Sequence, residues 1–223
     1  MVGRMVLAGL LCAAAMLGAV SGCAAGSQSD VSADIGRIAA LKDGFGSQFD
    51  VTEVAPTGID PALLASQSMP AGLTFDPAGC ARFAQGQSVP AGTEGNMAAV
   101  SAEGEGNRFV VIAVQTSTAV PVIEPESQCR KVAFTGGPTR GTVEVVDAPR
   151  IEGAETIGVH RMLQTVIDGT PRTGEVYSYS AHFGNYQVIV SANPLVSPGR
   201  PVVPVDTGRA RDLLIAGVEA VRG

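Results

Sequence analysis

Two histidines are the side chains of this 223-residue chain best suited to acid–base chemistry. His182 follows Ser178 and Ser180 on one face of an expected strand, and a histidine can activate a serine as a nucleophile. The G-x-S-x-G pattern of a hydrolase nucleophile is absent, and "GFGS" at 44–47 has the wrong spacing. We therefore expect the serines and His182 to form the polar outer face of a half-exposed sheet, and His160 to be a surface residue. The sequence predicts no catalytic residue, and a hydrolase is the less favoured alternative.

An acidic cluster at Glu94, Glu103 and Glu105 offers carboxylate oxygens, which calcium prefers. The cluster lacks EF-hand spacing, and "EGEGN" at 103–107 suits the solvated tip of a hairpin. No HExxH, P-loop or GxGxxG pattern occurs. We therefore expect no metal and no cofactor. The chain has 21 acidic against 15 basic side chains, which argues against nucleic acid as a partner.

The N-terminus has the pattern of an export signal. Arg4 is the only charged residue among the first 22, and residues 5–20 are uncharged and largely apolar. This segment is too short for a membrane span of about 20 apolar residues. We expect it to be removed as a signal peptide, residues 1–22.

The signal ends in Val20-Ser21-Gly22-Cys23, which resembles the lipobox of bacterial lipoproteins. That resemblance implies a diacylglyceryl group on Cys23 and cleavage just before it. Two acyl chains give stable anchoring, so the membrane is an expected partner, with residues 23–31 as a flexible tether. The alternative is an ordinary secretory signal with an incidental cysteine. In the favoured interpretation the protein stays on the extracytoplasmic face of the cell membrane.

Two further cysteines, Cys80 and Cys129, belong to the exported part of the chain. Two cysteines in an exported domain most often pair, so we expect a disulfide between them. Their separation of 49 residues would give about 4 kcal/mol of stabilisation on the chain-entropy model. A catalytic thiol is the alternative, and without a CxxC pattern a zinc site is not favoured.

The first half of the remaining chain carries several helix signals. Asp-Pro-Ala occurs at Asp60 and again at Asp76, where Asp can cap a helix and Pro suits its first position. The segment "PESQCRKVAF" at 125–134 is compatible with a helix or a strand, and we favour the helix. In order, we expect a helix at 32–43, a strand at 49–54, helices starting at 60 and 76, a hairpin of 97–102 and 109–116, and a strand at 142–146.

The second half predicts a three-strand meander followed by a helix. Strands are expected at 159–167, 175–183 and 186–192, with turns at Asp168-Gly169 and Gly184-Asn185. Asp206 or Thr207 caps the final helix, whose apolar residues fall on one side. Together these elements predict one α+β domain, residues 32–223, with an antiparallel sheet of about six or seven strands, helices packed on one face and one disulfide.

All three tyrosines lie within ten residues of one another, in a chain with only 4% aromatic residues. Tyr177, Tyr179 and Phe183 share one face of an expected strand, and Tyr186 begins its partner. Such a face could line a pocket for an apolar or sugar-bearing ligand. It could instead pack beneath the final helix, which we favour. These four residues are nevertheless the candidate ligand-binding site.

The segments "DPAGCARF", "ESQCRKVAF" and "YSYSAHFGNYQVIV", in this order after a lipobox, resemble small mycobacterial envelope lipoproteins of uncharacterised function. More distantly, the layout is similar to the extracellular sensor domain of mycobacterial membrane kinases. The resemblance implies a lipid-anchored binding or accessory protein that takes a lipid, a glycolipid or an envelope protein. A structural or antigenic surface protein without a small ligand is the alternative.

Overall fold

The computed structural model describes residues 33–60, 64, 69–86, 89, 93–197 and 199–223. The expected signal peptide and tether, with the lipidation site Cys23, lie outside the described residues, as does most of the helix expected after Asp60. Residues 32–223 form one unit, within which all the elements below lie.

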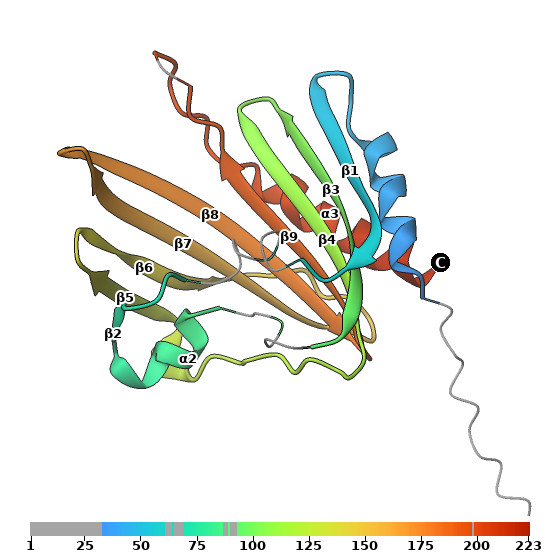
Figure 1. Cartoon of the computed structure of the whole chain (residues 1–223), viewed down its shortest axis with the longest axis horizontal. Helices are drawn as coiled ribbons and strands as arrows, with labels where there is room; N and C mark the ends of the chain where they lie inside the picture. Colours follow the sequence, from blue (N-terminus) through green and yellow to red (C-terminus); the bar gives the residue numbers. More distant parts are fainter. Residues whose placement is uncertain (1–32, 61–63, 65–68, 87–88, 90–92, 198) are drawn as a thin grey trace, which may run out of the picture. The chain divides into compact units, whose positions relative to one another are not determined.

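A single antiparallel sheet dominates this unit (Figure 1), with the order β1-β3-β4-β9-β8-β7-β6-β5-β2. Every neighbouring pair is antiparallel. The strands are β1 Phe49–Gly58, β2 Thr74–Asp76, β3 Gly95–Gly104, β4 Asn107–Thr116, β5 Lys131–Gly136, β6 Thr139–Val146, β7 Glu155–Ile167, β8 Thr170–Phe183 and β9 Tyr186–Pro194. The expected hairpin is β3–β4, and the expected meander is β7–β8–β9.

The helices described are short except for the last. They are η1 Ile35–Gly44, a 3₁₀ helix; η3 Ala78–Cys80, which leads into α2 Ala81–Ala84; η4 Ser127–Cys129; and α3 Thr207–Arg222. Asp206 caps α3 as expected, since its Oδ1 accepts a hydrogen bond from the Arg209 backbone N–H at 2.9 Å. Asp76 was expected to cap a helix, but it ends β2, and the turn that follows has no side-chain cap.

The expected strand count was wrong: the sheet has nine strands, not six or seven. The helix favoured at 125–134 is only the turn η4, after which the chain continues as β5. In β5 the alternation of buried Val132 and Phe134 with exposed neighbours has the period of a strand. β2 then pairs with the outer edge of β5.

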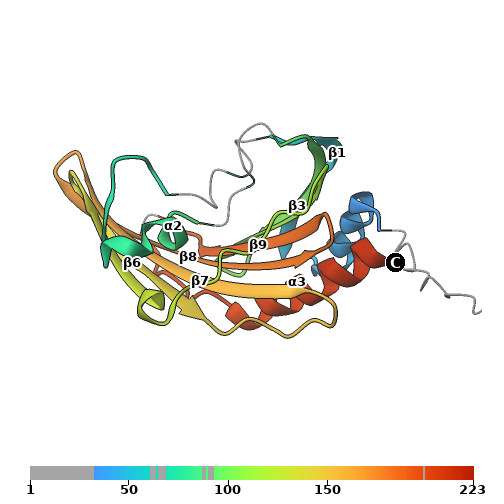
Figure 2. The same ribbon diagram turned by 90° about the horizontal axis from the view of Figure 1, so that it is seen from below.

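The two faces of the sheet bury different sets of side chains (Figure 2). α3 and η1 lie on one face, where Leu214 and Val218 of α3 and Ile38 of η1 join a core with β3, β4, β8 and β9. α2 lies on the opposite face, where Phe83 packs with Phe134 and Val159. Helices therefore cover both faces, not one face as expected.

The expected disulfide is present between Cys80 and Cys129, with an S–S distance of 2.02 Å. It joins η3 to the turn just before β5, and both cysteines are buried. The bridge explains why α2 lies on this face of the sheet: Cys80 is fixed beside the inward-facing residues of β5, and Phe83 follows it one turn later.

Candidate functional site

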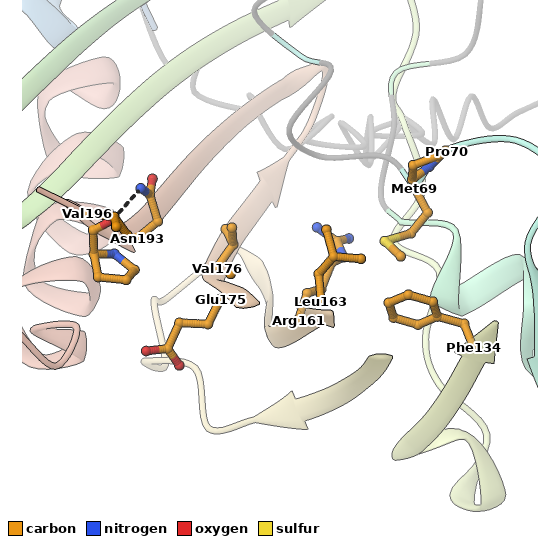
Figure 3. Close-up of a pocket in the computed structure, with 11 residues that line it drawn as sticks. Met69, Pro70, Phe134, Arg161, Leu163, Glu175, Val176, Asn193 and Val196 are labelled. Atoms are coloured by element: carbon orange, nitrogen blue, oxygen red, sulfur yellow. Dashed lines mark hydrogen bonds between the residues drawn. The ribbon is translucent and has the colours of Figure 1, made fainter. Parts of the chain in front are cut away.

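A cavity of about 390 Å³ lies on the face of the sheet opposite α3. Figure 3 shows residues from β5, β7, β8 and β9 and from the segment before β2 converging on it. Its walls are mostly apolar and include Met69, Phe134, Leu163, Val176 and Val196. The volume falls in the lower part of the range of small-molecule sites, about 300–1,000 Å³.

Strand alternation brings these side chains to one face. Arg161 lies opposite Val176, and Leu163 lies opposite Gly174, in the β7–β8 ladder. Directly paired residues in an antiparallel ladder point to the same side of the sheet. A side-chain Cβ at Gly174 would meet no atom within 4 Å, so this glycine leaves space above the sheet.

Phe134 reaches the cavity because a second glycine lies beside it. Gly141 pairs with both Phe134 on β5 and Leu163 on β7. A Cβ at Gly141 would come within 2.4 Å of the Phe134 ring. The ring therefore packs over the backbone of Gly141 and forms one apolar wall.

Arg161 places a cation in this apolar wall. The residue is 9% exposed, and its side chain points to the same side as those of Leu163 and Val176 (Figure 3). Burial lowers the pKa of Arg161 to about 10, because desolvation disfavours the charged form. The guanidinium therefore still carries its charge at neutral pH.

Glu175 also lies at the cavity wall, but its carboxylate points away from Arg161 (Figure 3). Its Oε2 lies 3.1 Å from Nε2 of His160, whose ring stacks on Tyr177 with a centroid distance of 4.1 Å. The adjacent residue Arg161 faces the cavity, so the sheet separates the two charges. The described cavity lining therefore contains two charged residues, Arg161 and Glu175, of which Glu175 pairs with His160.

The four candidate ligand-binding aromatic residues lie on the other face, toward α3 and η1, where packing beneath the final helix was the favoured expectation. Tyr179 is 2% exposed within that core, and burial raises its pKa. Phe183 and Tyr186 stack with a centroid distance of 5.7 Å. The Tyr186 hydroxyl donates to the Ala33 carbonyl and accepts from the Gln115 amide, both at 3.1 Å.

The aromatic cluster and the cavity are therefore separate, and none of its four members lines the cavity. For one residue that does line the cavity, Arg161, the sequence contained a signal. Arg161 is in phase with Val159 and Leu163 in the strand, a charged residue in an inward-facing row. Phe134 and Met69 could not be placed, because they come from separate strands and loops.

His182 was expected on a half-exposed face but is buried, at 7% exposure. Its Nδ1 lies 3.1 Å from the Val120 carbonyl, and its Nε2 lies 3.1 Å from the Gln187 amide nitrogen. These partners suit the neutral ring, with Nδ1–H donating and Nε2 accepting. Burial lowers the pKa of His182 and so favours the same neutral form.

Ser178 and Ser180 are buried beside His182, which corrects the expectation of a polar outer face. The reason is tertiary: Val122 and Ile123 of the segment before η4, together with α2, pack over this side of the sheet. His160 is also not a surface residue, since its side chain is 12% exposed.

Within the described ranges, no three His, Cys, Asp or Glu residues lie close enough together to hold a metal ion. No helix in the part of the chain that the structure describes is long and apolar enough to cross a membrane. A larger hollow of about 610 Å³ lies between η1 and α3. Its wall differs from that of the mostly apolar cavity, because it includes the exposed acidic residues Asp206 and Asp212.

Residues 34–222 match the family described as "Domain of unknown function (DUF5642)". The chain belongs to this family. It is similar to a crystallised uncharacterised protein of Mycobacterium smegmatis, the Rv0999 ortholog, with 56% identity and a TM-score of 0.81. That match covers 86% of this chain and 98% of the relative. No curated protein matches the chain.

A second solved structure, the extracellular domain of PknH from Mycobacterium tuberculosis, matches with 14% identity and a TM-score of 0.38. The match covers 85% of this chain and 93% of that domain. Its TM-score is too low to support an argument about function. Together the matches confirm the expected resemblance to uncharacterised mycobacterial proteins and the more distant likeness to a kinase sensor domain.

Proposed function

We propose that the protein is an extracytoplasmic lipoprotein that binds an amphiphilic ligand of the cell envelope, without a catalytic step. The observation that carries this proposal is the apolar cavity between Met69, Phe134, Leu163, Val176 and Val196, with Arg161 in its wall. Binding sites for small molecules are typically concave and mostly apolar, with a few polar groups that fix orientation. The cavity has this composition.

The location rests on two further features. The Cys80–Cys129 disulfide suits an oxidising compartment outside the cytoplasm. The lipobox at Cys23 would add two acyl chains and hold the domain at the membrane surface. A binding site for an amphiphile would then lie close to the membrane that contains such molecules.

The absence of a catalytic step is part of the proposal. Both ring nitrogens of His182 have partners, Val120 and Gln187, in a tautomer that leaves neither nitrogen for a neighbouring serine. Nε2 of His160 pairs with Glu175, and His160 itself does not line the cavity. Neither histidine is therefore placed as a general base for a ligand in the cavity.

Native mass spectrometry of residues 24–223, purified from a mycobacterial host, tests the proposal. We expect an extra mass that disappears after denaturing extraction. Gly174→Phe should abolish it, because the new ring would fill open space at the cavity. Gly58→Phe is the matched control, since Gly58 is a strand glycine with equally open surroundings that does not line the cavity.

The proposal fails if the wild-type protein carries no extra mass and takes up no alkyl ligand after purification. It also fails if Gly174→Phe folds and retains the bound mass as fully as Gly58→Phe. Circular dichroism establishes folding of both variants.

A further inference from the structure

We infer that residues 200–204 bind a second protein, which takes them as a polyproline II ligand in a groove lined by aromatic side chains. We call these residues, Arg-Pro-Val-Val-Pro, the proline segment. The segment belongs to the connection between β9 and α3, which projects from one end of the sheet (Figure 1). None of its five residues, all of which the structure describes, lines the cavity, so the inference goes beyond the proposed function.

The proline segment is restricted to an extended backbone. The proline ring fixes φ at about −65° at Pro201 and Pro204. The residue before a proline is driven out of the helical region, which restricts Arg200 and Val203 as well. Residues 201–206 accordingly form neither helix nor strand. Because a polyproline II helix has about three residues per turn, Pro201 and Pro204 lie on the same edge of such a segment.

The fold holds the proline segment in place before any partner binds. Asn107, at the start of β4, is 3% exposed, and its side chain contacts the end of the segment. Its Nδ2 donates to the Pro204 carbonyl at 3.4 Å, and its Oδ1 accepts from the Asp206 backbone N–H at 3.1 Å. Val203 packs over Gly106, where an added Cβ would lie 2.6 Å from Cγ2 of Val203. A segment that is already ordered loses less conformational entropy when it binds.

The proline segment remains accessible although it is held. All five of its residues are exposed, and the apolar residues Val202 and Val203 are 53% and 43% exposed. Polyproline II segments have no internal hydrogen bonds and dock their side chains into aromatic-lined grooves. Arg200 adds an exposed positive charge at the first position of the segment. An acidic side chain at one end of the partner's groove would pair with it and fix the direction in which the segment binds.

The position of the segment favours a protein over the membrane as its partner. The segment leads into Thr207, the first residue of α3. The chain enters the domain beside the last turn of α3, where the Asp34 backbone N–H donates to the Val221 carbonyl at 2.8 Å. α3 has 16 residues and is therefore about 24 Å long. The expected lipid anchor at Cys23 would join the domain at the end of α3 opposite the proline segment.

Site-specific photo-cross-linking of the full-length protein in mycobacterial cells tests the inference. A benzophenone amino acid replaces Val202, and in the matched control it replaces Val166, which is 46% exposed near the end of β7. We expect a cross-linked protein with the probe at position 202 that is absent with the probe at position 166. Mass spectrometry of the product should locate the cross-link in a peptide of the partner beside aromatic residues.

Two prolines carry the expected recognition, so their loss should remove it. Pro201→Ser together with Pro204→Ser should lower the yield of the product roughly tenfold, because both rings of one edge are lost. The matched control is Pro138→Ser together with Pro171→Ser, since these two prolines are exposed and lie outside the segment. The control should leave the yield unchanged.

The charge of Arg200 is tested in the same way. Arg200→Glu should lower the yield, because it would place an acidic side chain opposite the acidic group of the groove. Arg172→Glu is the matched control, since Arg172 is an exposed arginine of β8, and the yield should persist. Circular dichroism establishes that all the variants fold.

Three results would overturn the inference. They are no protein product with the probe at position 202, a product with lipid alone, and a yield that survives in the folded double variant of Pro201 and Pro204. Native mass spectrometry of that double variant separates the inference from the proposed function. The variant should keep the bound extra mass, because neither proline lines the cavity.

Discussion

Replacing Arg161 by methionine should make the ligand-free protein more stable. The buried guanidinium is charged at neutral pH, and desolvation lowers its pKa to about 10. A folded-state pKa below the unfolded value means that the charged form destabilises the folded state at every pH below about 10. This contribution diminishes only as the pH rises from the folded toward the unfolded value.

The size of the effect follows from the shift. The fall of the pKa to about 10 corresponds to a free energy of about 3 kcal/mol between the charged and neutral forms. Methionine has a similar length and retains apolar contact with the neighbouring residues of the wall. Methionine removes this desolvation cost but also loses the polar contacts of the guanidinium, which offset part of it. We therefore expect Arg161→Met to raise the free energy of unfolding by about 1–3 kcal/mol.

Urea unfolding at a pH near 7 measures this free energy of unfolding directly. It is carried out on delipidated wild-type protein and on the variants Arg161→Met and Arg172→Met. The exposed control should change the free energy of unfolding by less than about 0.5 kcal/mol. A loss of more than about 1 kcal/mol in Arg161→Met would refute the reasoning. It would show that the contacts of Arg161 in the ligand-free protein outweigh its desolvation, and that the residue is structural.

Three further changes test other parts of the structure. Serine at both Cys80 and Cys129 should lower the free energy of unfolding by roughly 4 kcal/mol, measured by urea titration, because a loop of 49 residues is no longer closed. As the pH falls from 6.5 to 5, wild-type protein should lose stability faster than His182→Gln, because His182 takes up a proton in the unfolded state before it does so in the folded state. The difference in slope should be at most about 1.4 kcal/mol per pH unit. Melting temperatures that fall in parallel with pH for the two proteins would contradict this. Gly217→Ala should lower the melting temperature and cost about 1–3 kcal/mol, because its Cβ would lie 2.9 Å from Val188 where α3 crosses the sheet. An unchanged melting temperature would mean that α3 can move away from the sheet without loss.

Local patterns predicted much of the fold correctly because they report what adjacent residues do. The β3–β4 hairpin, the meander β7–β8–β9 and the capped helix α3 each follow from alternation, turn residues or a capping side chain within a short stretch. The disulfide followed from composition, since the expected export signal and lipidation site leave two cysteines, which have one pairing.

The errors came where two patterns had equal local support. The stretch from Pro125 to Phe134 begins with a helix-start signal and ends with strand alternation, and pairing with β6 and β2 decided in favour of the strand. Likewise, Ser178, Ser180 and His182 have the composition of an exposed face. They are buried because a segment distant in sequence covers them.

The sequence by itself determined the chemistry that is present: two histidines without a hydrolase pattern, one pair of cysteines for a bridge, and an arginine in phase with apolar residues of a strand. Only the tertiary structure decided which face of the sheet each row of side chains meets. The tyrosines pack toward α3, whereas Arg161 faces a cavity formed with Met69 and Phe134. The physical reason is that a strand fixes the alternation of its side chains, but the burial and charge environment of each face depend on elements far away in the chain.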